Sequence, residues 1–111
     1  AMDVARGGSF STTNMNQQTD YPASAWYRPT DYDRPEDPTG FDAAGMEYFY
    51  WGMTTLMGGQ GDLTPLRCHQ VKLEWEPCTQ EKLQATDTQL YSLLTNSSYR
   101  LPTVLPDGYY R

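Results

Sequence analysis

Residues 43–57 carry apolar side chains at the spacing of an amphipathic helix. One helical face would hold the positions i, i+3, i+4, i+7 and i+11, which are Met46, Phe49, Tyr50, Met53 and Met57. Asp42 is a suitable N-cap before this stretch, and Gly58 is a suitable stop after it. A strand is the competing interpretation, because Tyr48–Trp51 has strand preference and two glycines weaken a helix. The spacing favours the helix.

Residues 70–76 alternate polar and apolar side chains. Val71, Leu73 and Trp75 would lie on one face of a half-buried strand. A second helix is predicted over residues 79–95 from a leucine stripe that Thr86 and Asp87 interrupt, with Asn96 as its cap. The chain then continues into residues 99–106, where two prolines favour an edge strand or an extended arm.

The predicted strand bears on the two cysteines, Cys68 and Cys78, which flank it. Ten residues of extended chain cover about 33 Å, whereas a disulfide needs Cα atoms about 5.5 Å apart. The strand therefore predicts free thiols and a reducing compartment. A disulfide is the alternative, and it requires the segment between the cysteines to fold back on itself.

The first forty residues contain little that a core could bury. Residues 1–19 are mostly small or polar, and residues 20–40 place four prolines among three tyrosines and a tryptophan. Proline removes a backbone donor and restricts the residue before it, so residues 20–40 form neither a regular helix nor a central strand. We expect an extended arm over residues 1–40 that another chain holds in place. The partner-binding candidates are the aromatic residues of both chain ends: Tyr21, Trp26, Tyr27, Tyr32, Phe41, Tyr109 and Tyr110.

These elements predict a small single α+β domain over residues 41–111. It would contain one or two short helices and two to four strands, with the long N-terminal arm and a short extended C-terminal arm. The composition agrees with a need for partners, because only 16 of 111 residues are Leu, Val or Phe and isoleucine is absent. Tyrosine, tryptophan and methionine, at 9, 3 and 5 copies, take their place and are enriched at protein interfaces.

The charge of the chain excludes several classes of partner. The formal net charge is −6, and no cluster of Lys and Arg offsets it. Phosphate backbones and anionic membranes repel such a surface, so we expect no direct binding to nucleic acid. The most apolar run, residues 45–57, contains Glu47 and is shorter than the roughly 20 residues that a membrane span requires. No charged start precedes an apolar stretch, so no signal peptide is expected in this chain.

Residues with catalytic potential are scarce. The single histidine, His69, directly follows Cys68, and neighbours on a strand point to opposite faces. The spacing of Cys68, His69 and Cys78 matches no zinc module. Glu74 and Glu76 are interpreted as a solvated strand edge, and the glycine-rich loop at 58–61 lacks the residues of a phosphate cradle. We predict no catalytic residues, no metal site and no cofactor.

The leading hypothesis is a non-enzymatic structural subunit that straps across neighbouring chains of a large assembly. The preferred setting is a virus particle, as a minor capsid, cement or tail-associated protein, and an accessory subunit of a large organellar complex is an alternative. A second alternative is a small secreted or periplasmic binding domain with a Cys68–Cys78 disulfide. A third is a metal-dependent or thiol enzyme using Cys68, His69 and Cys78. The expected location is a virion or a reducing intracellular compartment.

Overall fold

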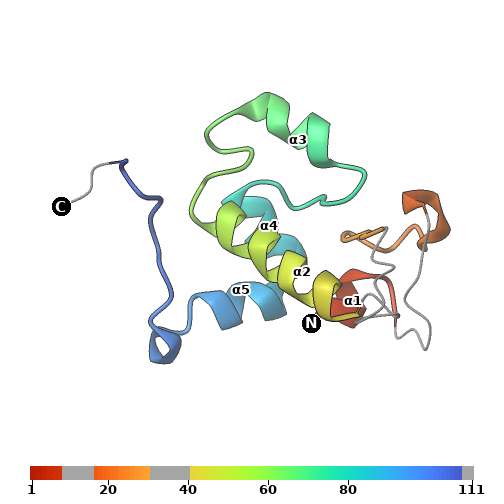
Figure 1. Cartoon of the computed structure of the whole chain (residues 1–111), viewed down its shortest axis with the longest axis horizontal. Coiled ribbons are helices and arrows are strands. Elements are labelled where there is room, and N and C mark those ends of the chain that lie inside the picture. The colour runs from red at the N-terminus through yellow and green to blue at the C-terminus, as the bar shows by residue number, and fades with distance from the viewer. Residues whose placement is uncertain (9–16, 31–40, 109–111) are drawn as a thin grey trace.

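The computed structural model describes residues 1–8, 17–30 and 41–108 (Figure 1). Its secondary structure is helical and consists of α1 (Met2–Ala5), η1 (Gln18–Asp20), α2 (Phe41–Leu56), α3 (Pro65–Val71), α4 (Gln80–Thr86), α5 (Thr88–Leu94) and η2 (Ser97–Tyr99). Over the described ranges there is no β-strand, and one isolated antiparallel bridge joins Tyr27 to Trp75. The α+β prediction is therefore wrong, and the described fold is all-helical.

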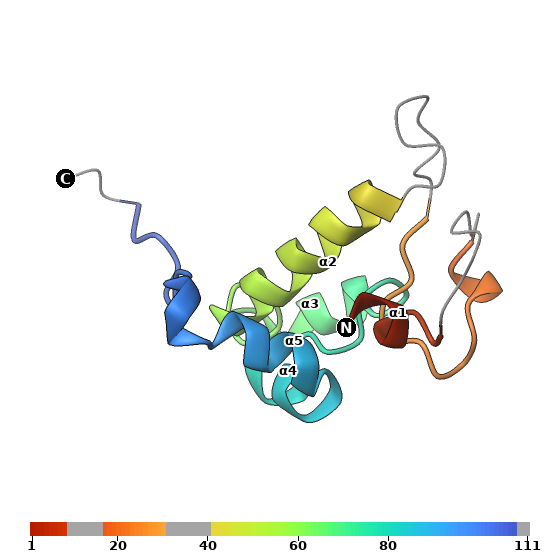
Figure 2. The ribbon, with the colours of Figure 1, turned by 90° about the horizontal axis from the view of Figure 1, so that it is seen from below.

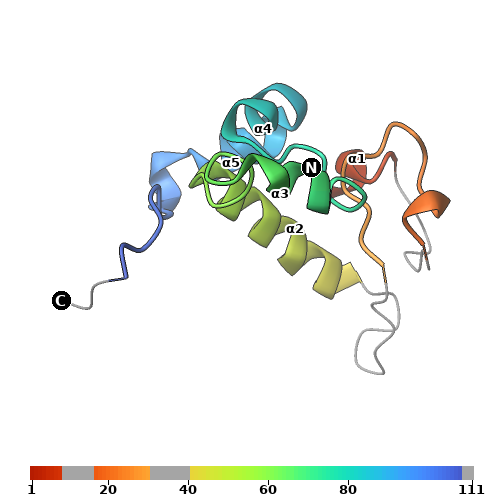
Figure 3. The same ribbon diagram turned by 90° about the horizontal axis from the view of Figure 1, so that it is seen from above.

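Helix α2 is the longest element and forms one edge of the molecule (Figures 2 and 3). Helices α4 and α5 pack against each other and against α2. The segment 17–30 lies at one end of the molecule, and residues 100–108 extend away at the other end (Figure 1). The core sits between α2, the α4–α5 pair and the turn that follows α3.

The predicted helix over residues 43–57 is confirmed, but its predicted core face is correct only in part: Met53 is buried and Met57 packs against the core. Most of the buried face of this helix is formed instead by Ala44, Tyr48, Trp51 and Thr55, at i, i+4, i+7 and i+11. Gly52 lies on the same side of the helix, and a Cβ added there would stand 2.6 Å from Leu90 Cδ2. The absence of a side chain at this glycine lets α5 approach closely, and Met46, Phe49 and Tyr50 of the predicted stripe are left exposed.

The two glycines of α2 give opposite predictions. We expect Gly52→Ala to lower the free energy of unfolding by about 2 kcal/mol, because the added methyl group overpacks against Leu90 and Leu94. Gly45→Ala is the matched control, since a Cβ there meets only Met2 Sδ at 4.0 Å. That substitution should stabilise the protein by about 0.5–1 kcal/mol through helix propensity. Urea unfolding followed by circular dichroism measures both, and equal effects at the two positions would contradict the close packing of α5 on α2.

The predicted strand over residues 70–76 is wrong. Helix α3 runs through Val71, and the Trp75 N–H donates to the Val71 carbonyl at 2.8 Å, as in one further helical turn. Val71 and Trp75 are buried, whereas Leu73 is exposed. The two buried residues are therefore related by i and i+4, and the alternation with Leu73 was coincidental.

The predicted helix over residues 79–95 is two helices, α4 and α5, that meet at Asp87. The Asp87 carboxylate accepts the backbone N–H of Leu90 at 3.0 Å and so caps α5. Asn96, predicted to end this helix, instead caps the η2 turn by accepting the N–H of Ser98. Residues 100–108 form an irregular arm that extends from the molecule, which agrees with the extended-arm alternative and not with the edge strand (Figure 1).

The centre of the core is aromatic. Trp75 is fully buried, with its ring centroid 6.1 Å from Tyr27, 6.1 Å from Tyr48 and 6.3 Å from Trp51. Its indole N–H donates to the Thr55 hydroxyl at 3.0 Å, so the polar atom of this large side chain is satisfied. Four aromatic rings thus supply the apolar volume that the aliphatic-poor composition lacks.

The described parts of the N-terminal third pack on their own chain. Ala5 and Tyr27 are fully buried, and the Trp26 and Tyr27 N–H groups both donate to the Ala5 carbonyl. Arg28 N–H donates to the Glu74 carbonyl at 2.8 Å, which ties this segment to the turn after α3. Residues 1–8 and 17–30 therefore do not require a second chain to hold them, contrary to expectation. The remainder of the expected arm, residues 9–16 and 31–40, lies outside the described residues.

Candidate functional site

The aromatic residues proposed to bind a partner have different environments. Tyr21 and Tyr27 are buried within the chain, where the Tyr21 hydroxyl donates to the Pro29 carbonyl and the Tyr27 hydroxyl to the Ala44 carbonyl. Trp26 is partly buried, and its indole N–H donates to Asp87 at 2.9 Å. Phe41 is the first residue of α2. Tyr32, Tyr109 and Tyr110 lie outside the described residues. Tyr21 and Tyr27 are thus buried in their own chain and are not available to a partner.

Cys68 and Cys78 form a disulfide, so the prediction of free thiols is wrong. The nine residues between them fold back through the end of α3 and a turn, which brings the two Cα atoms to 5.3 Å. His69 is exposed beside this bond. The described residues contain no group of three His, Cys, Asp or Glu side chains that is able to hold a metal ion.

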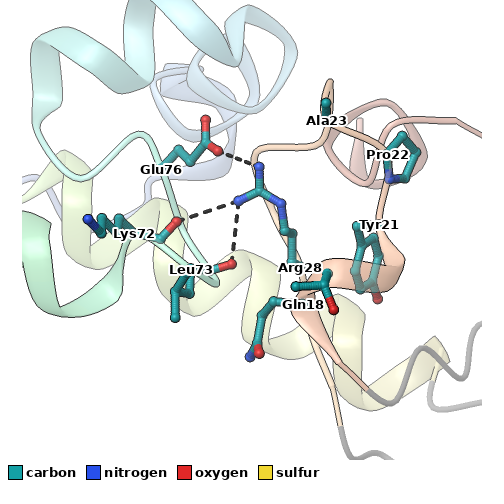
Figure 4. Close-up of a pocket in the computed structure, with 9 residues that line it drawn as sticks. Gln18, Tyr21, Pro22, Ala23, Arg28, Lys72, Leu73 and Glu76 are labelled. Carbon is teal, nitrogen blue, oxygen red and sulfur yellow. Dashed lines mark hydrogen bonds and ion pairs between the residues drawn. The ribbon is translucent and has the colours of Figure 1, made fainter.

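A cleft of about 490 Å³ separates the segment 18–23 from the turn after α3 (Figure 4). Tyr21 and Pro22 lie on one side of it, Leu73 lies on the other, and Arg28 stands between them (Figure 4). The Arg28 guanidinium forms an ion pair with Glu76 and donates to the Leu73 carbonyl at 3.4 Å. The volume of the cleft is that of a small-ligand site. The cation at its centre, Arg28, is paired with Glu76, and most of the exposed lining is apolar.

Two carboxylates, Glu47 on α2 and Glu74 in the turn after α3, interact electrostatically. The Oε2 atom of Glu47 is buried and has no donor within the described part of the chain. Burial, followed by repulsion from Glu74, raises the pKa of Glu47 to about 7. Burial also raises the pKa of Glu74, while the Trp51 indole opposes that rise. Glu74 is therefore not the solvated strand-edge residue that the sequence suggested.

The raised pKa of Glu47 predicts that stability depends on pH. Its ordinary value is 4.5 and its value in the folded protein is about 7, so the folded state holds this proton more tightly. The stabilising contribution is complete below about pH 4.5 and is lost as the pH rises through about 7. We expect the urea midpoint to fall over this range, and to fall less in Glu47→Gln. Parallel pH profiles for the wild type and the variant would contradict this assignment.

An exposed apolar stripe follows the outer side of α2. Met46, Phe49 and Tyr50 are 69%, 43% and 50% exposed, although their spacing placed them in the core. Helices α4 and α5 lie on the other side of α2 (Figure 2). The sequence signal that distinguishes the two stripes is Gly52, because the stripe that contains a glycine is the one that a neighbouring helix approaches closely. We call Met46, Phe49 and Tyr50 the α2 outer stripe.

Comparisons of this chain with protein-family models, with curated proteins and with solved structures find no match. Among the described helices, none has both the length and the apolar content needed to cross a membrane. The interpretation of the site therefore depends on the geometry described above.

Proposed function

We propose that this chain is a non-enzymatic protein-binding subunit that docks a basic protein partner on the α2 outer stripe. The observation that carries this proposal is the exposure of Met46, Phe49 and Tyr50 along one side of the longest helix. Aromatic and methionine side chains supply large contact areas and are enriched where protein surfaces meet. An amphipathic helix whose second apolar side remains open is a recurring mode of recognition between proteins.

The choice of a basic partner follows from charge. The chain carries a net charge of −6, so two copies repel each other, whereas a positively charged protein is attracted and steered toward the surface. The contact should therefore combine the apolar α2 outer stripe with attraction by the net charge of the chain, and its affinity should decrease with rising salt concentration.

The disulfide supports a setting in which thiols are oxidised. Such bonds persist in secreted and periplasmic proteins and on virion surfaces, and they are rare in reducing compartments. The Cys68–Cys78 bond thus favours an oxidising location over the reducing one that the sequence suggested. It also favours the alternative of a small binding domain with a disulfide. A virion component or an organellar accessory subunit agrees with the same bond where its surroundings are oxidising.

The proposal is tested by site-specific crosslinking followed by reconstitution. A photo-reactive phenylalanine analogue replaces Phe49 in the native setting, and the same analogue replaces Leu66 as a control, since Leu66 is 72% exposed on α3. We expect one basic protein to be crosslinked from position 49 and not from position 66. Binding of that purified protein is then measured for Phe49→Ala and Leu66→Ala.

Phe49→Ala should weaken the affinity by about tenfold or more, as expected for a buried aromatic anchor. Leu66→Ala should bind as the wild type does. Equal crosslinking from both positions, a second copy of this chain as the crosslinked species, or wild-type affinity of Phe49→Ala would each refute the α2 outer stripe as the docking surface.

A further inference from the structure

The two cysteines of the disulfide differ in their exposure and in their neighbours. Cys78 is 1% exposed and precedes the N-cap of α4, whereas Cys68 lies in α3 and is only partly buried. Lys82 places its Nζ atom 3.8 Å from the Cys78 sulfur. Because Cys68 is the more exposed of the two residues, an external reagent should reach its sulfur first. The sulfur with a neighbouring cation belongs to the more deeply buried cysteine.

We propose that Cys68 is the site at which this disulfide exchanges with an external dithiol. A thiolate of the dithiol attacks Cys68 Sγ and forms a mixed disulfide, and the bond between the two cysteines breaks. Cys78 leaves with the electron pair as a thiolate beside the Lys82 ammonium. The second thiolate of the dithiol then attacks the dithiol sulfur that is bonded to Cys68. This closes a disulfide within the dithiol and releases Cys68 as a thiolate. The dithiol is oxidised by two electrons, and the protein disulfide is reduced by two.

Lys82 favours Cys78 as the leaving group of this exchange. A thiolate that is stabilised by a nearby ammonium has a lower pKa, and a thiol of lower pKa is a faster leaving group. Attack at Cys68 expels the sulfur that has this cation. Formation of the bond follows the same path in reverse. The Cys68 thiolate attacks the disulfide of an oxidised carrier and forms a mixed disulfide with it. The Cys78 thiolate then attacks Cys68 Sγ, closes the protein disulfide and releases the reduced carrier.

The exchange has a local structural consequence. The segment between the cysteines contains Leu73 and Glu76, which line the cleft, and Trp75, which is fixed in the core. Gly61 packs on the bond from the other side, since its N–H donates to the Cys78 carbonyl at 2.7 Å and an added Cβ would stand 2.2 Å from Cys68 Sγ. Reduction should therefore loosen the wall of the cleft that Leu73 and Glu76 form, while Trp75 still anchors this segment in the core.

The test uses the oxidised wild-type protein and glutathione as a single-thiol probe, quenched at short times. Early quenching captures the mixed disulfide before the released protein thiolate closes the bond again or a second glutathione completes the reduction. Acid quenching and peptide mass spectrometry locate the glutathione. We expect Cys68 to carry about tenfold more label than Cys78, because access decides which sulfur is attacked. Label that is equal at the two cysteines, or greater at Cys78, would overturn the assignment.

The role of Lys82 is tested with the two lysines of the chain. Lys82→Gln should slow the first exchange step by about threefold or more, since the leaving thiolate loses its cation. Lys72→Gln removes the same charge from an exposed lysine and should exchange at the wild-type rate. Equal rates for the two variants would refute the part assigned to Lys82. Neither measurement involves a partner protein, so these outcomes are independent of the proposed docking surface.

Discussion

Replacing Asp87 with alanine is expected to lower the free energy of unfolding by about 4 kcal/mol. The Asp87 side chain is 2% exposed and accepts hydrogen bonds from the Trp26 indole, the Tyr48 hydroxyl and the Leu90 backbone N–H. Each buried donor left without an acceptor costs about 1–3 kcal/mol. Loss of the cap of α5 adds about 1 kcal/mol. Partial relaxation of the neighbouring side chains keeps the total loss of unfolding free energy below the sum of these costs.

Asp62→Ala is the matched control for this prediction. Asp62 is exposed and accepts a single backbone N–H, that of Gln80, at 2.9 Å. Its removal should cost at most about 1 kcal/mol, as for a solvent-exposed hydrogen bond. Asp87→Asn should fall between the two alanine variants, because its amide retains one oxygen as an acceptor. Urea unfolding of the three variants measures the series, and an Asp87→Ala loss no larger than that of Asp62→Ala would contradict the role of Asp87.

Asp87 also explains how segments that are distant in sequence are assembled. The same Oδ2 atom accepts from Trp26 in the N-terminal segment and from Tyr48 on α2, while Oδ1 caps α5. A buried carboxylate with three donors is costly to leave unpaired, and it therefore specifies one arrangement of these elements. From the sequence, Asp87 was only an interruption in a leucine stripe. A capping aspartate between two short helices produces the same interruption.

The sequence predicted the helices better than it predicted the faces they bury, whereas its predicted strands were wrong. The helix at 43–57 followed from spacing alone, but two apolar stripes share that helix, and only the close approach of α5 at Gly52 selects between them. The segment 70–76 was ambiguous because Val71 and Trp75 agree with both a period of two and a separation of four. Two tertiary interactions favour the turn over the strand: the bridge between Trp75 and Tyr27, and the disulfide that joins the two ends of the segment.

The N-terminal third was misjudged for a related reason. Its low apolar content suggested that it lacks the means to hold itself. Yet a few residues suffice here: Tyr27 fills the aromatic core, and backbone bonds from residues 26–28 reach Ala5 and Glu74. Average composition does not show where individual tyrosines lie. The α2 outer stripe, by contrast, was visible in the sequence as an apolar stripe, and only its exposure was unforeseen.

Removal of the disulfide is expected to cost about 3 kcal/mol of unfolding free energy. Cys68 and Cys78 are 10 residues apart in sequence, and closing a loop of that size in the unfolded chain accounts for a loss of about 3 kcal/mol. The double variant Cys68→Ser/Cys78→Ser and the chemically reduced wild type should both show it. The reduced protein retains both sulfur atoms, so agreement between the two separates the effect of the crosslink from that of packing. Urea unfolding measures the loss, and hydrogen exchange should show increased exchange at residues 65–76 with α5 still protected. A loss below about 1 kcal/mol in both forms would mean that the aromatic core around Trp75 holds the turn without the bond.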